Sequence, residues 1–214
     1  LALAHRLATA NSQDIQEILD NVIVLIVPSM NPDGLQKIKA WYENTIGTQH
    51  EGVGPPFLYH KYGGHDNNRD WFMFNLVETR LVVKHCLNMW HPHIVVDVHQ
   101  TRTDGMRMIL PPFTDPIEPN VNPILESELA MLGSTIAAEL TAQGKKGVAT
   151  NVVYDAYSPS RAYSLLHGGV RLLIETASSR LASPINLNHT DLRSARGDDP
   201  THRSWNHPLP WEGG

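Results

Sequence analysis

Runs of apolar residues mark buried strands at three places along the chain. Residues 22–27, 94–99 and 170–175 are rich in Val, Ile and Leu. The first run is continuous and β-branched, which is typical of a strand buried on both faces of an α/β sheet. The other two are apolar until they end in polar or charged residues. A shorter run at residues 106–110 predicts a further strand.

Helical patterns lie between these strands, at about residues 12–19, 35–44, 76–89 and 124–143. Ser12 and Asn75 stand where an N-cap is expected, since short polar side chains can accept from the first free backbone N–H groups. Gly144 is typical of a helix end. Strands that alternate with helices predict an α/β fold with helices on both faces of a sheet.

The chain ends do not look like natural termini. Leu3 and Leu7 have small alanine neighbours and resemble the second half of a buried helix, while the last residues form no closing element. We therefore expect a fragment of a longer polypeptide, truncated at both ends. Residues 1–182 are predicted to form one partial domain. Residues 183–214, rich in Asn, His, Asp, Arg, Pro and Gly, are predicted to be a surface tail or linker.

Composition excludes several classes of protein. With 214 residues, 41% of them hydrophobic, the chain suits about one globular domain. A net charge of −5 argues against general nucleic-acid binding, which needs a basic face. No apolar run approaches the roughly 20 residues of a membrane helix. The single Cys86 excludes an internal disulfide framework and a multi-cysteine metal site.

Chemically useful residues follow three of the predicted strands. The first strand leads into the turn at residues 31–34, the second ends at Asp97 and His99, and the third ends at Glu175. Sites in α/β sheets collect at the carboxyl ends of the strands. We therefore expect a functional site there, with Asp97 either orienting a ligand residue or making a structural hydrogen bond.

Four motifs in this order carry a resemblance to a known family. They are Asn-Pro-Asp-Gly at 31–34, Asn-Arg-Asp-Trp at 68–71, Asp-Val-His at 97–99, and the strand that ends at Glu175. In order and rough spacing the chain resembles the zinc carboxypeptidases (the carboxypeptidase A-like, or funnelin, family) over residues 1 to about 182. The long loop at residues 45–70 is similar to that of bacterial-type branches. The resemblance implies an α/β fold with a mixed central sheet flanked by helices.

The resemblance also implies a zinc ion, with His99 as one of its ligands. Zinc sites of enzymes need about three protein ligands and one open position for water. The family takes the other two from an upstream His-x-x-Glu motif, and none of the 12 histidines here has Glu three positions later. We expect the missing ligands just upstream of Leu1. These 214 residues then hold one ligand of three.

Other family roles carry over to matching residues. Glu175 matches the general base, which takes a proton from metal-bound water. Asn68 and Arg69 match the pair that holds the terminal carboxylate of a substrate, for which a guanidinium offers a planar fork of donors. His65 lies near this pair and is a candidate to line the same cleft.

The chain departs from the family at the arginine that stabilises the oxyanion, because residues 35–68 contain no Arg. We expect Arg161 to supply that positive charge. The segment that contains Arg161 is where the family places a mobile tyrosine over the substrate. Tyr154 and Tyr157 are both candidates, and each could instead be an ordinary core or surface tyrosine.

The predicted function is zinc-dependent hydrolysis of a peptide or amide bond in the intact parent, on a peptide or an amino-acid derivative. A possible partner is the rest of the same polypeptide, and a periplasmic or extracellular location is favoured. The alternative is a non-catalytic carboxylate-binding or peptide-binding module with a degenerate metal site. A serine hydrolase of the α/β class is disfavoured, because the chain has no Gly-x-Ser-x-Gly motif.

Overall fold

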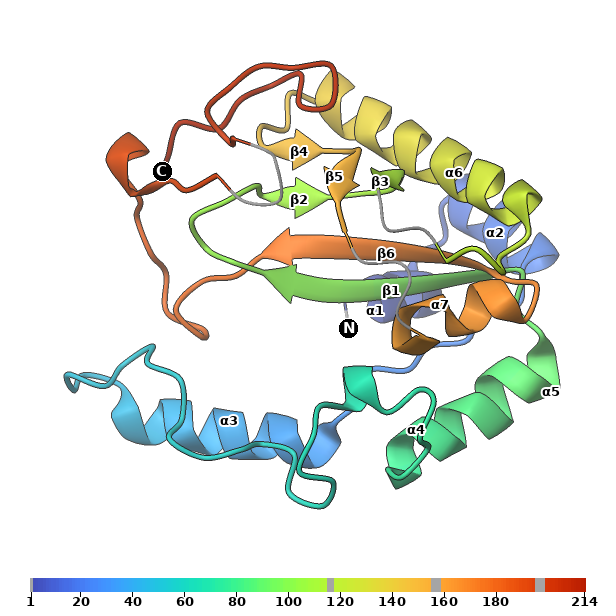
Figure 1. Ribbon diagram of the computed structural model, residues 1–214, viewed down its shortest axis with the longest axis horizontal. Helices are drawn as coiled ribbons and strands as arrows, with labels where there is room; N and C mark the ends of the chain where they lie inside the picture. Colours follow the sequence, from blue (N-terminus) through green and yellow to red (C-terminus); the bar gives the residue numbers. More distant parts are fainter. Residues whose placement is uncertain (1, 115–117, 155–158, 195–198) are drawn as a thin grey trace.

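The computed structural model describes residues 2–114, 118–154, 159–194 and 199–214, with the side chains of residues 159–162 left out. A four-stranded mixed sheet lies at its centre (Figure 1). The strand order is β1 (Ile94–Thr101), β6 (Val170–Ala177), β2 (Met108–Ile109) and β4 (Val148–Ala149). β1 runs parallel to β6, β2 runs antiparallel to β6, and β4 runs parallel to β2. The predicted α/β class with a mixed sheet and flanking helices is confirmed.

Helices and short turns surround this sheet. The helices are α1 (Ala2–Thr9), α2 (Gln13–Asn21), α3 (Pro32–Thr45), α4 (Val77–Val82), α5 (Asn88–Trp90), α6 (Pro123–Ala142) and α7 (Pro159–Leu166). A π-helical segment, η2 (Val83–Leu87), joins α4 to α5, and 3₁₀ turns form at η1 (Asn67–Arg69) and η3 (His189–Asp191). A second, two-stranded sheet pairs β3 (Phe113–Thr114) with β5 (Val152–Val153).

α6 covers one face of the sheet. Asn122 caps this helix by accepting the Ile124 N–H at 3.0 Å, and Gly144 follows its end with a left-handed φ of 75°. Leu129 of α6 packs against Val170 and Leu172 of β6, and β6 has more buried residues than any other described strand. The predictions for residues 124–143 and 170–175 are thus confirmed.

β1 is exposed on one face and half-buried on the other. Its register with β6 puts Ile94, Val96 and Val98 on the face that α6 covers at β6, because paired positions share a face. α6 lies over β6 and β4 and does not reach these side chains, so that Val98 is 65% exposed. The strand predicted at residues 94–99 is therefore present, but the prediction that it is buried is wrong for this face.

The strand predicted at residues 22–27 is absent. These residues form no strand, and their apolar side chains are exposed, with Ile23 at 72%. An extended segment becomes a strand only when a neighbour accepts and donates its backbone hydrogen bonds. No described segment pairs with residues 22–27. The N-terminal helix forms as predicted in α1, but Leu3 is 64% exposed, so its predicted burial is also wrong.

The predicted turn at residues 31–34 is instead the start of α3. The Asn31 side chain caps this helix by accepting the Gly34 N–H at 2.8 Å, and Pro32 occupies the first turn. Proline suits that position because its missing N–H would have no helical partner. A Cβ on Gly34 would lie only 2.2 Å from Asn31 Nδ2, so glycine leaves room for the cap.

The N-cap of the helix predicted after residue 75 lies one residue later than expected, and α4 begins at Val77. Leu76 is the N-cap residue of α4, and the Asn75 backbone N–H donates to the side chain of Asp70 at 3.1 Å. A buried carboxylate from the preceding loop thus replaces the capping box that the sequence predicts. His91 ends this helical region with a left-handed φ of 43°.

The C-terminal segment follows the edge of the sheet. The Gly147 N–H donates to the Leu209 carbonyl at 2.8 Å, and the Thr150 N–H donates to the Asn206 carbonyl at 2.9 Å. Arg107 lies over the ring of Trp211 at 4.4 Å. The division of the chain at residues 182 and 183 stays a prediction. None of the helices described is both long and apolar enough to span a bilayer.

Candidate active site

Two adjacent strand ends bring His99 and Glu175 together. The parallel register of β1 and β6 pairs His99 with Glu175 directly, so both side chains leave the same face of the sheet. Asp97 precedes His99 by two residues and Arg171 precedes Glu175 by four, so both also lie on this face. α6 covers the opposite face. The backbone ladder thus fixes where these four side chains begin.

The carboxylate of Asp97 orients His99. Its Nε2 lies 2.9 Å from Asp97 Oδ1, and Arg171 donates to the other carboxylate oxygen through Nε at 3.0 Å and through Nη2. Burial alone would raise the pKa of Asp97, but the hydrogen bond from His99 and the charge of Arg171 outweigh it and lower this pKa to about 2. Asp97 therefore stays a carboxylate and accepts from His99.

This arrangement decides which nitrogen of His99 could bind a metal. Because Asp97 can only accept, Nε2 carries a hydrogen, and the neutral ring keeps its lone pair on Nδ1. A carboxylate behind a histidine is the usual support of a metal ligand. His99 fits one ligand position of a zinc site. Within the described residues no group of three or more His, Cys, Asp or Glu could hold a metal ion, so these residues do not form a complete site.

Tyr154 holds the carboxylate of Glu175. The Tyr154 hydroxyl donates to Glu175 Oε1 at 2.6 Å, and both residues are buried, at 3% and 5% exposed. The ring of Phe113 packs on Tyr154 at 4.9 Å. Glu175 Oε2 is buried without a hydrogen-bond partner among the described residues. One oxygen of this carboxylate is thus held, and the other is left for a further donor.

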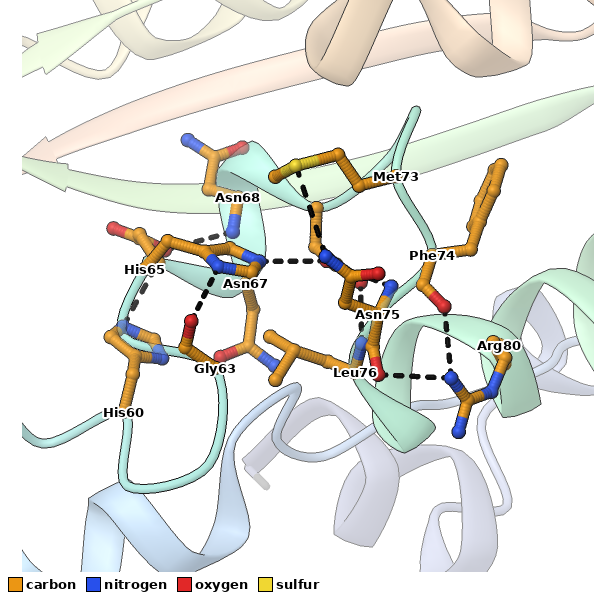
Figure 2. Close-up of polar contacts among 12 residues, drawn as sticks. His60, Gly63, His65, Asn67, Asn68, Met73, Phe74, Asn75, Leu76 and Arg80 are labelled. Atoms are coloured by element: carbon orange, nitrogen blue, oxygen red, sulfur yellow. Dashed lines mark hydrogen bonds and ion pairs between the residues drawn. The ribbon is translucent and has the colours of Figure 1, made fainter.

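The Asn–Arg turn, η1 (Asn67–Arg69), carries the second group of candidate residues. Asp66 caps it by accepting the Asn68 N–H at 2.8 Å. Asn67 is buried and donates to the Met30 carbonyl at 2.9 Å, which ties the turn to the segment before α3. Arg69 is exposed, and within the described residues its side chain has no hydrogen bond or ion pair. Figure 2 shows Asn68 projecting from the turn toward the side where β1 and β6 run.

Aromatic contacts join the Asn–Arg turn to the sheet through α7. Tyr163 of α7 lies 5.7 Å from the ring of Trp71 and 5.8 Å from that of Phe74. α7 also packs against both η1 and β6. Phe72, between these contacts, is exposed. The turn is therefore linked to β6, the strand that contains Glu175, by packed side chains and not by backbone hydrogen bonds between strands.

The zinc carboxypeptidase family model matches residues 1–95. This stretch contains α3 with its Asn31 cap and the whole Asn–Arg turn, and it ends inside β1 before His99. No curated protein and no solved structure matches the chain. The part of the chain that carries Asn68 and Arg69 is thus similar to the zinc carboxypeptidases, a family of metallocarboxypeptidase hydrolases. The roles of His99 and Glu175 stay predictions.

The structure brings some of the predicted carboxypeptidase-like residues together and leaves others apart. His99, Glu175 and Tyr154 gather at the strand ends, and Asn68 and Arg69 share one turn. Among the described residues no hydrogen bond or ion pair joins the two groups. Arg161 lies in α7, but its side chain is outside what the structure describes, and Tyr157 lies outside the described residues altogether.

Sequence reasoning missed two residues that shape this site. Arg171 sits inside an apolar strand, where a charge requires a partner, and this signal pointed to a carboxylate on the neighbouring strand. Asp70 is 0% exposed and binds His65 at 2.7 Å, while the role of His65 in lining the cleft stays a prediction. An acidic residue directly after the Asn-Arg pair gave no comparable signal.

Proposed function

We propose that this chain carries the carboxylate-recognition and general-base part of a zinc carboxypeptidase-like peptidase. Its substrate would be a peptide or an acylated amino acid with a free carboxylate, cleaved at the neighbouring peptide or amide bond. The observation that carries the proposal is the direct pairing of His99 with Glu175 at the ends of adjacent parallel strands. The match of residues 1–95 to the zinc carboxypeptidases supports it.

Recognition would fall to the Asn–Arg turn. The guanidinium of Arg69 is exposed and available, and a planar fork of N–H donors suits a carboxylate. Asn68 beside it adds an amide donor. Because the turn is held by Asp66 and Asn67, a bound carboxylate would meet donors that are already in place.

Glu175 would serve as the proton acceptor. Its Oε1 is held by Tyr154, so Oε2 is the oxygen that can take a proton from a water molecule. A zinc ion would polarise the scissile carbonyl and lower the pKa of its bound water. His99 offers one ligand through Nδ1, and a zinc site would need two more donors than the described residues provide.

Calorimetric titration of the 214-residue chain tests the recognition step. We expect N-acetyl-glycyl-phenylalanine to bind and its C-terminal amide to bind at least tenfold more weakly, since the charged acceptor is lost. Arg69→Met should abolish this preference, whereas Arg203→Met, at an exposed arginine of the C-terminal segment, should preserve it. Equal binding of acid and amide to the unaltered chain would contradict the proposal.

A second function has one observation in its favour. The recognition turn is fully formed, while the described residues contain no group of three or more His, Cys, Asp or Glu that could hold a metal ion. This combination fits a non-catalytic module that binds carboxylate-bearing peptides. Elemental analysis of zinc after dialysis, followed by a hydrolysis assay with added Zn²⁺, separates the two when both are made on the parent polypeptide that includes the residues upstream of Leu1. Zinc-dependent cleavage that Glu175→Gln abolishes supports the peptidase, and peptide binding without cleavage supports the module.

A further inference from the structure

Asp66 and Asp70 hold the Asn–Arg turn at its two ends. Asp66 accepts the Asn68 N–H at the start of the turn. At the other end the Asp70 backbone N–H donates to the Asn67 carbonyl at 3.0 Å. The Asp70 carboxylate then accepts the backbone N–H groups of Asn75 at 3.1 Å and Leu76 at 3.0 Å. Asp70 therefore fixes the turn to the N-terminus of α4.

His65 closes the loop around the turn. Its Nε2 lies 2.7 Å from Asp70 Oδ1, and its Nδ1 lies 2.8 Å from the Gly63 carbonyl (Figure 2). Both partners are acceptors only, so both ring nitrogens must donate, which requires the imidazolium form. The chain thus places a cation against a carboxylate that has no exposed surface.

We propose that the His65–Asp70 pair is a positioning clasp that aims Asn68 and Arg69 at the carboxylate of the substrate. This inference rests on the proposed function of the Asn–Arg turn. Residues 65 and 70 bracket the turn, and their contact is the shortest side-chain link across its base. The turn has no strand ladder, so side-chain bonds of this kind decide where its donors point.

The charged form of the His65–Asp70 pair exists only over part of the pH scale, because His65 must be protonated. Its hydrogen bond with Asp70 raises the pKa of His65, and Asp66 adds to this effect. The carboxylates that face His65 are thus Asp70 and Asp66, and His60 lies 3.7 Å from Asp66 on the other side. Because the pKa of His65 is raised, the charged clasp is complete below the ordinary value of 6.5 and is lost as the pH rises through the raised value.

Titrations of the full chain with N-acetyl-glycyl-phenylalanine and its amide test the clasp. His65→Ala should weaken binding of the acid about tenfold at pH 6 and leave binding of the amide unchanged. His65→Gln keeps a neutral donor near the position of Nε2 and should restore part of the affinity. His85→Ala, at an exposed histidine of η2, is the matched control and should bind as the unaltered chain does.

The pH profile separates positioning from simple stability. Affinity of the unaltered chain for the acid should fall between pH 6 and pH 9, and the profile of His65→Gln should be flatter. If His65→Ala keeps full affinity and the same profile, the clasp is overturned while the loss in Arg69→Met still upholds the proposed function. Equal weakening of acid and amide in His65→Ala would also overturn it, because that result indicates a general loss of structure. If Arg69→Met keeps full preference for the acid, the proposed function itself fails.

Discussion

The strand-end pair and the Asn–Arg turn are held in place by different means. His99 and Glu175 are register partners in a ladder that runs the full length of β1 and β6. Asn68 and Arg69 lie in a loop, where Asp66, Asp70 and buried Asn67 supply the bonds that a ladder would provide. The proton-accepting group is thus placed by backbone, and the recognition group is placed by side chains.

This difference predicts how each part responds to substitution. A residue on the ladder can change without moving its neighbours, because the backbone bonds remain. A residue that holds the turn cannot change in this way, because its own side chain makes the hydrogen bonds that fix the turn. Substitutions of His99 and Glu175 should therefore alter chemistry more than stability, and substitutions of the residues that brace the turn should alter both.

Asp70→Ala should have the largest effect on stability. It leaves the backbone N–H groups of Asn75 and of buried Leu76 without their acceptor and His65 without its partner, which should cost about 3 kcal/mol or more. Glu175→Gln, which still accepts from Tyr154, should cost about 1 kcal/mol or less. Urea denaturation of both variants measures the contrast. Equal losses would contradict the distinction between turn and ladder.

The Asp97 ion pair should produce the next largest effect, as a function of pH. Its folded pKa of about 2 lies below the ordinary 3.8, so the carboxylate stabilises the fold above pH 4 and this contribution disappears as the pH falls through 2. The contribution should be about 2 kcal/mol. The stability gap between the unaltered chain and Asp97→Asn should narrow by that amount from pH 4.5 to pH 2. Asp20→Asn, at an exposed carboxylate, is the control, and an unchanged gap for Asp97→Asn would refute the pair.

Two matched helix caps give the smallest effect and the finest test. Asn31→Ala and Asn122→Ala each remove a cap in front of a proline-started helix, at a cost of about 1 kcal/mol. Asn31 also lies 3.1 Å from His60 Nδ1, beside the Asn–Arg turn. Only Asn31→Ala should therefore weaken binding of N-acetyl-glycyl-phenylalanine. Equal binding by both variants would show that the turn does not depend on this contact.

The sequence predicts the parts of the fold in which pattern and partner lie within the described chain. β6 and α6 follow from an apolar run and from a helical segment that Gly144 ends, and the two elements bury apolar side chains against each other. Residues 22–27 have an equally strong pattern and form no strand, because no described segment provides their ladder. The apolar pattern of a segment indicates its tendency to be buried. Whether the segment is buried depends on a second segment that packs or pairs with it.

The candidate site shows the same limit at the level of single residues. His99 and Glu175 were predictable because each follows an apolar strand, and strand ends meet at one edge of a sheet. The bonds that orient them come from Asp97 with Arg171 and from Tyr154, at separations of 74 and 21 residues for Asp97–Arg171 and Tyr154–Glu175. The His65–Asp70 bond spans five residues, but it depends on irregular loop geometry that no periodic pattern encodes.

The central claim is that the Asn–Arg turn and the strand-end pair serve one binding site. Backbone amide NMR of the ¹⁵N-labelled chain, titrated with N-acetyl-glycyl-phenylalanine, tests it most directly. We predict that the signals of Asn68 and Arg69 and those of His99 and Glu175 shift together along a single saturation curve. Shifts confined to one group, or two curves with different dissociation constants, would contradict the claim.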